Sequence, residues 1–407
     1  MSSSNSTAAP VHARILGDAP VRLWGLSPRA RLTRLLERAG VAGVDDAADP
    51  APPEGSVVLV RGDWVYDDRV VAALVRTREV FLQAAGDDGP VIVAAHVPAA
   101  LAARAGQVVR GAAAPDLPGV VVKEPASLAS ASQVKLRKLE RPFVRQARPE
   151  RRRELEDRLF TGAYKGVTDL ITKWLWPRPA RWATAVCVAG GLRPNHVTLF
   201  GLAMVIVAGV AFANGTRGWG LVAAWLMTFL DTVDGKLARV TVTSSKVGHV
   251  LDHGVDIVHP PLWYIAWGLG LAAFEPGLPG LTVGVTLAVI VAGYVLGRVI
   301  EGAFHAYGPF SIFLWRRFDS YSRLITARRN PNLIWLTAGA LAGRPDLGLV
   351  AVAAWTTLST LVLLLRLGMA ALEWRRSGPL RSWLIDANED PPARSLATRI
   401  FATSTGD

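Results

Sequence analysis

Residues 231–256 have the sequence DTVDGKLARVTVTSSKVGHVLDHGVD, and apolar segments of membrane-spanning character lie on both sides of it. Asp231 and Asp234 are three residues apart, and Asp252 and Asp256 are four apart. On a helix, each of these pairs would share one face. Residues 240–247 between them are β-branched and rich in Ser and Thr, which favours a turn. The stretch therefore predicts a helical hairpin on which two acidic faces meet.

Four clustered carboxylates need a counter-charge, because they repel one another and each costs several kcal/mol when left bare in an apolar setting. A divalent cation, or a pair of them, removes both penalties, and an all-oxygen ligand set indicates Mg²⁺ or Mn²⁺. A solvated acidic loop is the alternative, but acidic residues within membrane segments are functional by default. His249 and His253 are also spaced like a zinc pair. The aspartates explain the stretch better, and the predicted metal ligands are Asp231, Asp234, Asp252 and Asp256.

Written out, the pattern is Asp231-x2-Asp234-Gly235-x2-Ala238-Arg239-x8-Gly248-x3-Asp252-x3-Asp256. It resembles the signature of the CDP-alcohol phosphotransferases (CDP-alcohol phosphatidyltransferases), with all eight fixed positions present. The resemblance implies an integral membrane enzyme that transfers the substituted phosphate of a CDP-alcohol to an acceptor hydroxyl and releases CMP. It further implies two bound metal ions, Asp256 as the general base and a homodimeric assembly.

The same signature suggests which residues face the nucleotide. Gly235 and Gly248 suit places where backbone approaches a ligand closely, and Ala238 is small for the same reason. Arg239 would neutralise the phosphate on the cytidine side. Upstream, residues 194–198 are similar to the segment that opens the first transmembrane helix in this family. The predicted nucleotide-binding residues are Asn195, Thr198, Asp231, Gly235, Ala238, Arg239, Ser245 and Gly248.

Basic residues outside the signature suggest where an acceptor phosphate could bind. Residues 305–330 place arginines beside hydroxyl and amide side chains, which suits bidentate capture of phosphate. Contact with lipid headgroups is the alternative and stays open. Arg298 and Glu301 could form an ion pair within the membrane, or Arg298 could reach the phosphate. The predicted acceptor-site residues are Lys165, Arg298, Arg328 and Arg329.

Hydropathy predicts a multi-pass α-helical membrane domain over residues 191–373. About six spans are expected, at 197–213, 219–238, 248–274, 281–304, 332–342 and 347–372. The short loops on one side carry few cations, whereas the opposite side, which bears the acidic stretch, carries many. By the positive-inside rule, both termini and the acidic residues face the cytosol.

Composition narrows the class of protein. The 407 residues are 51% hydrophobic with a net charge of +12, and the basic residues cluster beside apolar segments. That distribution indicates an anionic lipid surface and argues against nucleic acid. The one cysteine, Cys187, rules out an internal disulfide framework. No signal-peptide pattern is present at the N-terminus, so we expect an integral protein of the cell (inner) membrane.

Residues 1–145 predict a small cytosolic α/β domain after about 20 disordered residues. Residues 21–26 are expected as a strand, residues 57–60 and 91–95 as buried parallel strands, and residues 28–39, 67–77 and 98–105 as helices. The domain resembles the sugar-nucleotidyltransferase domain of bifunctional inositol-phosphate cytidylyltransferase/di-myo-inositol-phosphate-phosphate synthases. It lacks a glycine-rich phosphate loop, which favours a non-catalytic role over an active nucleotidyltransferase.

The remaining segments connect and end these domains. Residues 136–158 alternate in charge and predict a solvated linker or surface helix, and residues 159–181 predict an amphipathic helix in the membrane interface. We expect residues 146–190 to link the two domains. Residues 374–407 form a polar tail that we expect to be disordered from about residue 378. Domain order favours the inositol-phosphate branch. A CDP-diacylglycerol-dependent phosphatidyltransferase, or a silent scaffold or transporter on the same fold, is the alternative.

Overall fold

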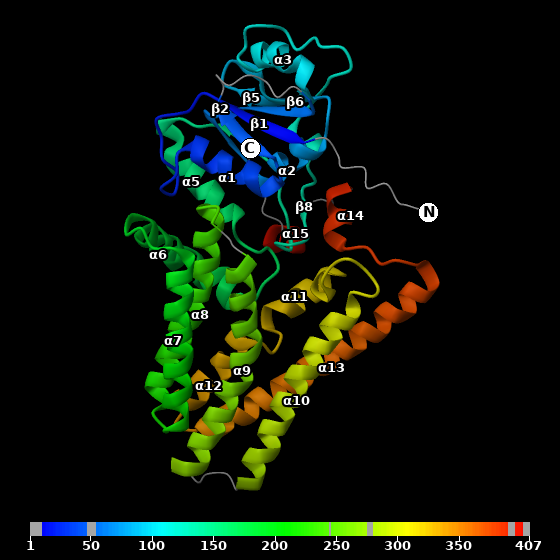
Figure 1. Ribbon diagram of the computed structural model, residues 1–407. Coiled ribbons are helices and arrows are strands. Elements are labelled where there is room, and N and C mark those ends of the chain that lie inside the picture. Colours follow the sequence, from blue (N-terminus) through cyan, green and yellow to red (C-terminus); the bar gives the residue numbers. More distant parts are fainter. Residues whose placement is uncertain (1–9, 47–53, 244–245, 275–279, 390–394, 402–407) are drawn as a thin grey trace, which may run out of the picture.

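The computed structural model describes residues 10–46, 54–243, 246–274, 280–389 and 395–401. An α/β domain lies at one end of a long helical bundle, and short helices from the C-terminal part of the chain lie between them (Figure 1). This arrangement confirms the expected division into an N-terminal α/β region and a helical region.

The described part of the α/β domain contains a six-stranded sheet in the order β2-β1-β3-β6-β5-β7. Its central strand β6 runs antiparallel to both β3 and β5, because a tight turn joins β5 to β6 as a hairpin. The expectation of a parallel strand at 91–95 is therefore wrong in direction. The strands are β1 (Val11–Leu16), β2 (Gly43–Asp46), β3 (Ser56–Arg61), β5 (Val80–Gly86), β6 (Gly89–Pro98) and β7 (Val121–Lys123).

Two expectations near the N-terminus are corrected. Residues 11–16, expected to be disordered, form β1, which is paired on both sides and buries Ala13 and Ile15 completely. Residues 21–26, expected to be a strand, form a loop closed by one bridge between Leu23 and Leu26. The buried pairing of β1 with β2 and β3 outweighs the polar composition of its surroundings.

Helices cover both faces of the sheet. The first, α1 (Pro28–Ala39), begins as predicted, with the Ser27 hydroxyl accepting from the Ala30 amide at 3.1 Å. Along with α2 (Asp68–Arg76), it packs on one face, and α3 (Ala102–Val109) packs on the other. The short elements are η1 (Ala99–Leu101), α4 (Pro125–Leu128) and the two-stranded pair β4 (Trp64–Tyr66) with β10 (Val144–Gln146).

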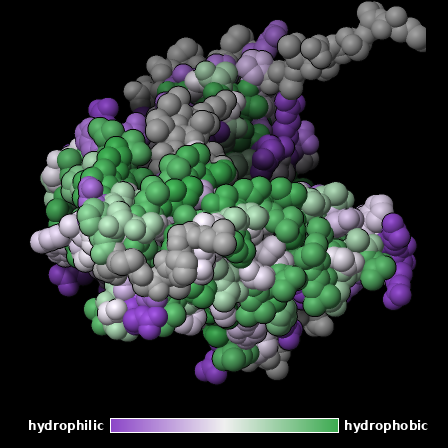
Figure 2. All heavy atoms as spheres, turned by 90° about the horizontal axis from the view of Figure 1, so that it is seen from below, coloured by the Kyte–Doolittle hydropathy of each residue, from purple (hydrophilic) through white to green (hydrophobic). Residues whose placement is uncertain are grey.

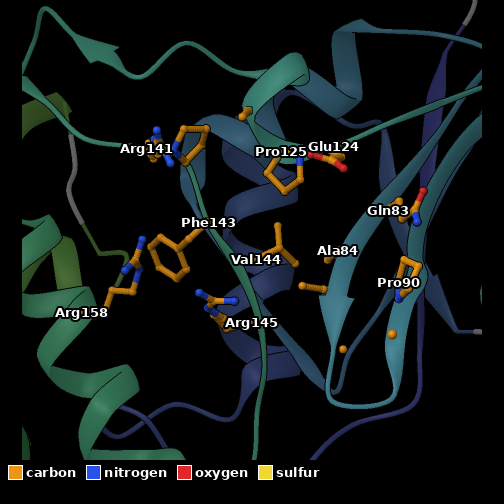
Figure 3. A pocket seen from close by; sticks show the side chains of 15 residues that line it. Gln83, Ala84, Pro90, Glu124, Pro125, Arg141, Phe143, Val144, Arg145 and Arg158 are labelled. Atoms are coloured by element: carbon orange, nitrogen blue, oxygen red, sulfur yellow. The ribbon is translucent and has the colours of Figure 1, made fainter. Parts of the chain in front are cut away.

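A cavity of about 480 Å³ opens in the α/β domain between the β5–β6 hairpin and residues 141–145 (Figure 3). The guanidinium of Arg158 lies 4.4 Å above the ring of Phe143 at its edge. All of the residues that line the cavity fall between positions 83 and 158. This cavity therefore belongs to the α/β domain and lies apart from the acidic stretch.

The charged segment after residue 136 is buried in part. Strands β8 (Ser132–Gln133) and β9 (Lys138–Leu139) form a hairpin. Lys138 in β9 forms an ion pair with Glu140, and the two side chains are 0% and 2% exposed. The Lys138 ammonium also donates to the Gly162 carbonyl at 2.6 Å. The expected solvated linker is thus wrong at these two residues, because their charges satisfy one another inside the protein. The alternative of a surface helix is confirmed for residues 152–158, which form a helix with exposed residues at 152–154 and 157.

The expected single interfacial helix over 159–181 is also corrected. The segment is divided among the end of α5 (Arg152–Gly162), preceded by η2 (Pro149–Arg151), a π-helical turn η3 (Ile171–Leu175) and the start of α6 (Pro177–Ala189). Val167 is fully buried, whereas Trp174 and Trp182 are exposed. Only part of the segment therefore presents an apolar face outward.

All six expected membrane segments are helical. Among the described residues, four helices are long and apolar enough to cross a membrane: α7, α9 from Asp256, α10 from Thr282, and α13. The other two are more polar or shorter. Seen from below, hydrophobic residues occupy much of the bundle surface (Figure 2). The helices are α7 (Pro194–Ala213), α8 (Arg217–Val240), α9 (Lys246–Phe274), α10 (Gly280–Phe304), α12 (Arg329–Leu341) and α13 (Pro345–Ser377).

The segment expected to be a disordered tail forms two short helices, α14 (Trp383–Glu389) and α15 (Leu396–Phe401). Trp383, Leu384 and Phe401 are buried against η4 (Ile312–Leu314) and α11 (Arg317–Ile325). The Trp383 indole donates to the Ser320 hydroxyl at 2.9 Å. Aromatic burial therefore fixes a polar-looking end of the chain between the two domains.

We expect Gly166→Ala to destabilise the junction between the domains. A Cβ atom at Gly166 would lie 2.5 Å from the Cβ of Lys138 and 2.6 Å from the carbonyl oxygens of Arg137 and Phe401. Overpacking of this kind costs about 1–3 kcal/mol. The midpoint of thermal unfolding in detergent should fall. Gly162→Ala is the matched control, since its new Cβ would meet its nearest neighbour only at 4.0 Å. An unchanged midpoint for Gly166→Ala would show that the junction accommodates the added Cβ atom without loss of stability, which would contradict the prediction.

Candidate functional site

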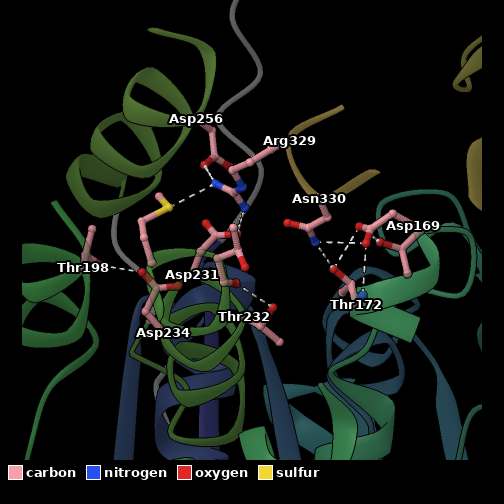
Figure 4. A network of polar contacts seen from close by, with 12 residues as sticks. Asp169, Thr172, Thr198, Asp231, Thr232, Asp234, Asp256, Arg329 and Asn330 are labelled. Atoms are coloured by element: carbon pink, nitrogen blue, oxygen red, sulfur yellow. Dashed lines mark hydrogen bonds and ion pairs between the residues drawn. The ribbon is translucent and has the colours of Figure 1, made fainter. Parts of the chain in front are cut away.

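One guanidinium links the acidic residues of two helices. Asp231 lies on α8 and Asp256 on α9, and Arg329, at the first position of α12, contacts both. Its Nη2 lies 2.5 Å from the Asp231 Oδ2, and its Nη1 lies 2.7 Å from the Asp256 Oδ1 (Figure 4). The prediction that acidic faces of adjacent helices meet is confirmed for these two aspartates.

Asp234 lies one helical turn after Asp231 and contacts the neighbouring helix. Its Oδ2 accepts a hydrogen bond of 2.7 Å from the hydroxyl of Thr198 on α7. That hydroxyl also lies 3.1 Å from the Pro194 carbonyl oxygen within its own helix. Asp234 is only 6% exposed. A predicted metal ligand and a predicted nucleotide-binding residue therefore lie side by side.

The other predicted nucleotide-binding residues on α7 and α8 line the same end of the bundle. Asn195 is exposed in the first turn of α7. A Cβ atom added at Gly235 would lie 3.6 Å from the Arg239 guanidinium, and Ala238 is half-buried between them. Arg239 donates to the Ala163 carbonyl at 3.0 Å. The basic side chain predicted to meet a phosphate thus contacts the segment that joins the two domains.

Three positions of the signature fall at the limit of what the structure describes. Ser245 lies outside the described residues. Gly248, His249, Asp252 and His253 belong to α9. What surrounds these four residues also lies outside the part of the chain that the structure describes. Among the residues that are described, no group of three His, Cys, Asp or Glu side chains is arranged to hold a metal. The four-aspartate metal site therefore stays a prediction.

Carboxylates that share a cation have the donor chemistry of a hard-metal site. The side chains of Asp231 and Asp256 are 21% and 34% exposed, and that of Arg329 is 16% exposed. Both aspartates offer oxygen atoms toward one positive group, which is the ligand type that Mg²⁺ and Mn²⁺ prefer. The residues present therefore fit such an ion.

The predicted acceptor-site residues divide into two groups. Arg329 pairs with the aspartates, whereas Arg328, the next residue in sequence, pairs with Glu301 on α10. The expected alternative of an Arg298–Glu301 pair is wrong, because the start of α12 brings Arg328 to that carboxylate. Arg298 instead donates to the Tyr294 hydroxyl at 3.3 Å. Lys165 is exposed on the segment before η3.

The sequence analysis missed a polar network beside Arg329. Asn330 donates to the Asp169 Oδ1 at 2.9 Å, and the Thr172 hydroxyl donates to the other oxygen at 2.8 Å (Figure 4). Burial raises the pKa of Asp169, but the charge of Arg323 and these hydrogen bonds outweigh it and hold the pKa below its usual value. The spacing Asp169-x-x-Thr172, typical of a helix start, was the available signal.

Most of the predicted metal and nucleotide residues fall within a stretch that matches a known family. Residues 192–314 match the family model described as CDP-alcohol phosphatidyltransferase. The chain carries a CDP-alcohol phosphatidyltransferase domain. The match includes Thr198, Asp231, Asp234 and Asp256, whereas Arg329 follows it.

Three curated relatives of this phosphatidyltransferase domain are named phosphatidylinositol phosphate synthase. The protein from Mycobacteroides abscessus is 33% identical over 148 residues, which are 35% of this chain and 66% of that protein. The Streptomyces avermitilis protein is 35% identical over 92 residues, 21% of this chain and 38% of its own. The Mycolicibacterium smegmatis protein is 28% identical over 107 residues, 25% and 48% of the two chains. This chain thus spans less than two thirds of each.

Two crystal structures of Mycobacterium tuberculosis phosphatidylinositol phosphate synthase have a low structural similarity to this chain. The structure with CDP-DAG bound has a TM-score of 0.38 and 18% identity, over 47% of this chain and 94% of that one. The complex with manganese and citrate has a TM-score of 0.36 and 18% identity, over 46% and 87%. At these scores, neither structure bears on the fold of the phosphatidyltransferase domain described above.

We expect Arg329→Met to destabilise the domain by about 2 kcal/mol. The loss leaves two carboxylates without their counter-charge, and it is smaller than for a fully buried pair because all three side chains keep some exposure. Added Mg²⁺ should raise the thermal unfolding midpoint of the variant more than that of the wild type. Arg381→Met removes a pair with Asp386 in which both side chains are 59% exposed, and it should leave the midpoint unchanged. A wild-type midpoint for Arg329→Met would contradict the bridging role.

Proposed function

We propose that this chain is a metal-dependent CDP-alcohol phosphotransferase that transfers a phosphatidyl group to a phosphorylated inositol and releases CMP. The observation that carries the proposal is the meeting of Asp231 on α8 and Asp256 on α9 within the family domain. Opposed carboxylates at the end of a helical bundle are the means by which a protein without thiolate ligands can hold hard cations against a diphosphate.

The substrates follow from the chemistry implied by the relatives' name. A phosphatidylinositol phosphate contains a phosphatidyl group, an inositol and a further phosphate. If the donor is CDP-diacylglycerol, it supplies the phosphatidyl group, so the acceptor must supply the inositol and the extra phosphate. This favours a reaction that uses CDP-diacylglycerol and forms a lipid product over one that forms a soluble di-myo-inositol phosphate. Both alternatives share a phosphorylated inositol.

Asp231, Asp234, Asp252 and Asp256 are the residues that would hold Mg²⁺ or Mn²⁺. The ions, when bound, supply positive charge that offsets the charge of the pyrophosphate. The hydrogen bond from Thr198 fixes the orientation of the Asp234 carboxylate. Arg329 keeps Asp231 and Asp256 facing one another and lowers the repulsion between them.

Asp256 is the proposed general base. The acceptor hydroxyl attacks the phosphorus that carries diacylglycerol, the new oxygen–phosphorus bond forms, and the bond to the CMP oxygen breaks. The hydroxyl proton passes to a carboxylate oxygen of Asp256 as the attacking oxygen gains negative charge. Arg239, next to Gly235, is placed to receive the CMP phosphate if it exchanges the Ala163 carbonyl for that stronger acceptor.

Placement in the membrane completes the proposal. Arg239 and Lys236 lie at the end of α8 that approaches the α/β domain, and the cationic loops share that end. The positive-inside rule assigns this end to the cytosol, with both termini. The donor would then reach the site from the lipid and the acceptor from water. Assembly as a homodimer stays a prediction from the family resemblance.

We expect purified protein to release CMP from CDP-diacylglycerol only when inositol phosphate and Mg²⁺ or Mn²⁺ are present. Asp256→Asn should lower the turnover rate about 10²- to 10⁴-fold, the range for loss of a general base. Its thermal unfolding midpoint should stay near that of the wild type. Asp116→Asn, which changes an exposed carboxylate of the α/β domain, is the control and should keep full activity.

Two outcomes would contradict the proposal. Wild-type turnover by Asp256→Asn would remove Asp256 as the base. The absence of metal-dependent CMP release across a panel of CDP-alcohols and inositol acceptors would favour the silent scaffold.

A further inference from the structure

The β8–β9 hairpin carries an arginine in a conformation that disfavours arginine. Arg137 has φ of 51°, in the left-handed region, at the turn that the Arg137 amide closes onto the Val134 carbonyl at 3.1 Å. A residue with a Cβ atom loses about 1–2 kcal/mol there, and glycine would lose nothing. Such strain is kept where the side chain has a use. The side chain of Arg137 is therefore a candidate for function.

Hydrogen bonds fix this hairpin against the segment that leads into the membrane domain. The Arg137 carbonyl accepts from the Val167 amide at 2.9 Å, and the Leu136 carbonyl accepts from the Gly166 amide at 2.9 Å. In Figure 1, β8 lies between the sheet and the membrane helices. Arg137 thus belongs to the α/β domain but lies at the junction, beside Lys165.

The same segment continues directly to the start of α12. Two residues after Val167, Asp169 accepts the 2.9 Å hydrogen bond from Asn330, which follows Arg328 and Arg329. A short run of backbone and hydrogen bonds therefore connects Arg137 to the arginines of the membrane domain.

The neighbouring charges confirm that these cations share one region. Burial, together with the charges of Arg323 and Arg298, lowers the pKa of Arg137 to about 10. Cations from the hairpin, the linking segment, α10, α11 and the residue that precedes α12 act on one another. They are Arg137, Lys165, Arg298, Arg323 and Arg328.

Among the described residues, the anionic side chains here are too few to balance these cations. Glu301 pairs with Arg328, and Asp169 faces Arg323. The Nε of Arg298 and an Nη of Arg323 are buried and have no hydrogen-bond partner in the part of the chain that the structure describes. Buried guanidinium nitrogens without a hydrogen-bond acceptor are costly. A phosphate monoester, with a double charge and several acceptor oxygens, has the chemistry to satisfy them.

We propose that Arg137 binds the phosphate of the acceptor together with Arg298 and Arg323, so that the α/β domain completes the acceptor site. This inference rests on the proposed function for the identity of the acceptor. Its consequence is that the α/β domain selects a phosphorylated inositol over inositol itself. The contact comes from a domain outside the stretch that matches the family.

Arg137→Gly tests this inference in the full-length protein. Glycine removes the side chain and accepts the left-handed backbone, so the thermal unfolding midpoint should stay equal or rise. The KM for inositol phosphate should rise about 10- to 100-fold, the loss expected for charged hydrogen bonds, with kcat nearly unchanged. Any slow turnover with unphosphorylated inositol should keep its KM. Arg137→Lys should recover part of the affinity, because one ammonium replaces a two-pronged donor.

Lys135→Ala is the matched control. Lys135 lies two residues away in the same turn, carries the same charge and is exposed. It should leave the KM for inositol phosphate and the unfolding midpoint unchanged. An equal effect of Lys135→Ala and Arg137→Gly would indicate a diffuse surface potential and would overturn the specific contact.

A binding measurement separates this inference from the proposed function. Calorimetric titration of wild type and Arg137→Gly with inositol phosphate, inorganic phosphate or phosphatidylglycerol micelles needs no turnover. Weaker binding of inositol phosphate by the variant supports the inference, even if the wild type releases no CMP and the proposed function fails. Unchanged binding of inositol phosphate overturns it. A loss confined to phosphatidylglycerol also overturns it, because the site would then serve a lipid headgroup.

Discussion

The ion pairs of Arg329 with Asp231 and Asp256 hold the functional end of the bundle together. Two carboxylates on adjacent helices repel one another, and they can be brought to one place only if a cation lies between them. That cation comes from a third helix, so α8, α9 and the start of α12 must meet at one level. Asn330, the next residue, then fixes the linking segment through Asp169. The site and the domain junction thus depend on one arrangement of charge.

The sequence predicted those parts of the structure that local rules govern. The spacing of Asp231 and Asp234 set their shared face, and Ser27 with Pro28 set the start of α1, because each depends on residues within one or two turns. Hydropathy in the same way located helices at the six expected positions, and four of the helices in the described part of the chain are long and apolar enough to cross a membrane. The family match then covered the stretch that had carried the resemblance.

Long-range pairing decided the parts that the sequence did not predict. Residues 11–16 look like a polar terminus until β2 and β3 bury them from both sides. Arg298 and Glu301 have the spacing of a helical ion pair, but Arg328, 27 residues along the chain from Glu301, takes the carboxylate instead. The Arg329 bridge could not be foreseen, since its two partners lie 98 and 73 residues away. Local spacing states which residues could pair, and only packing decides which do.

The buried ion pair of Lys138 and Glu140 shows why the junction is built from a charged segment. A soluble domain that packs on membrane helices needs a contact surface that is also stable in water before it is buried. Alternating charges meet this need, because they are solvated when exposed and neutralise one another when enclosed.

The proposed function also gives a physical reason for this chain to combine the membrane helices with an α/β domain. A donor with two acyl chains is confined to the bilayer, whereas a phosphorylated polyol is confined to water, so the two must meet at the surface. Membrane helices can present arginines there only from below, through their ends. A hairpin from the α/β domain, fixed by Gly166 and Val167, can present Arg137 from above. In the proposed acceptor site, a phosphate held from both directions would be removed from bulk water. In this arrangement, the α/β domain contacts the acceptor through Arg137, the residue of the β8–β9 turn that has a strained left-handed backbone conformation.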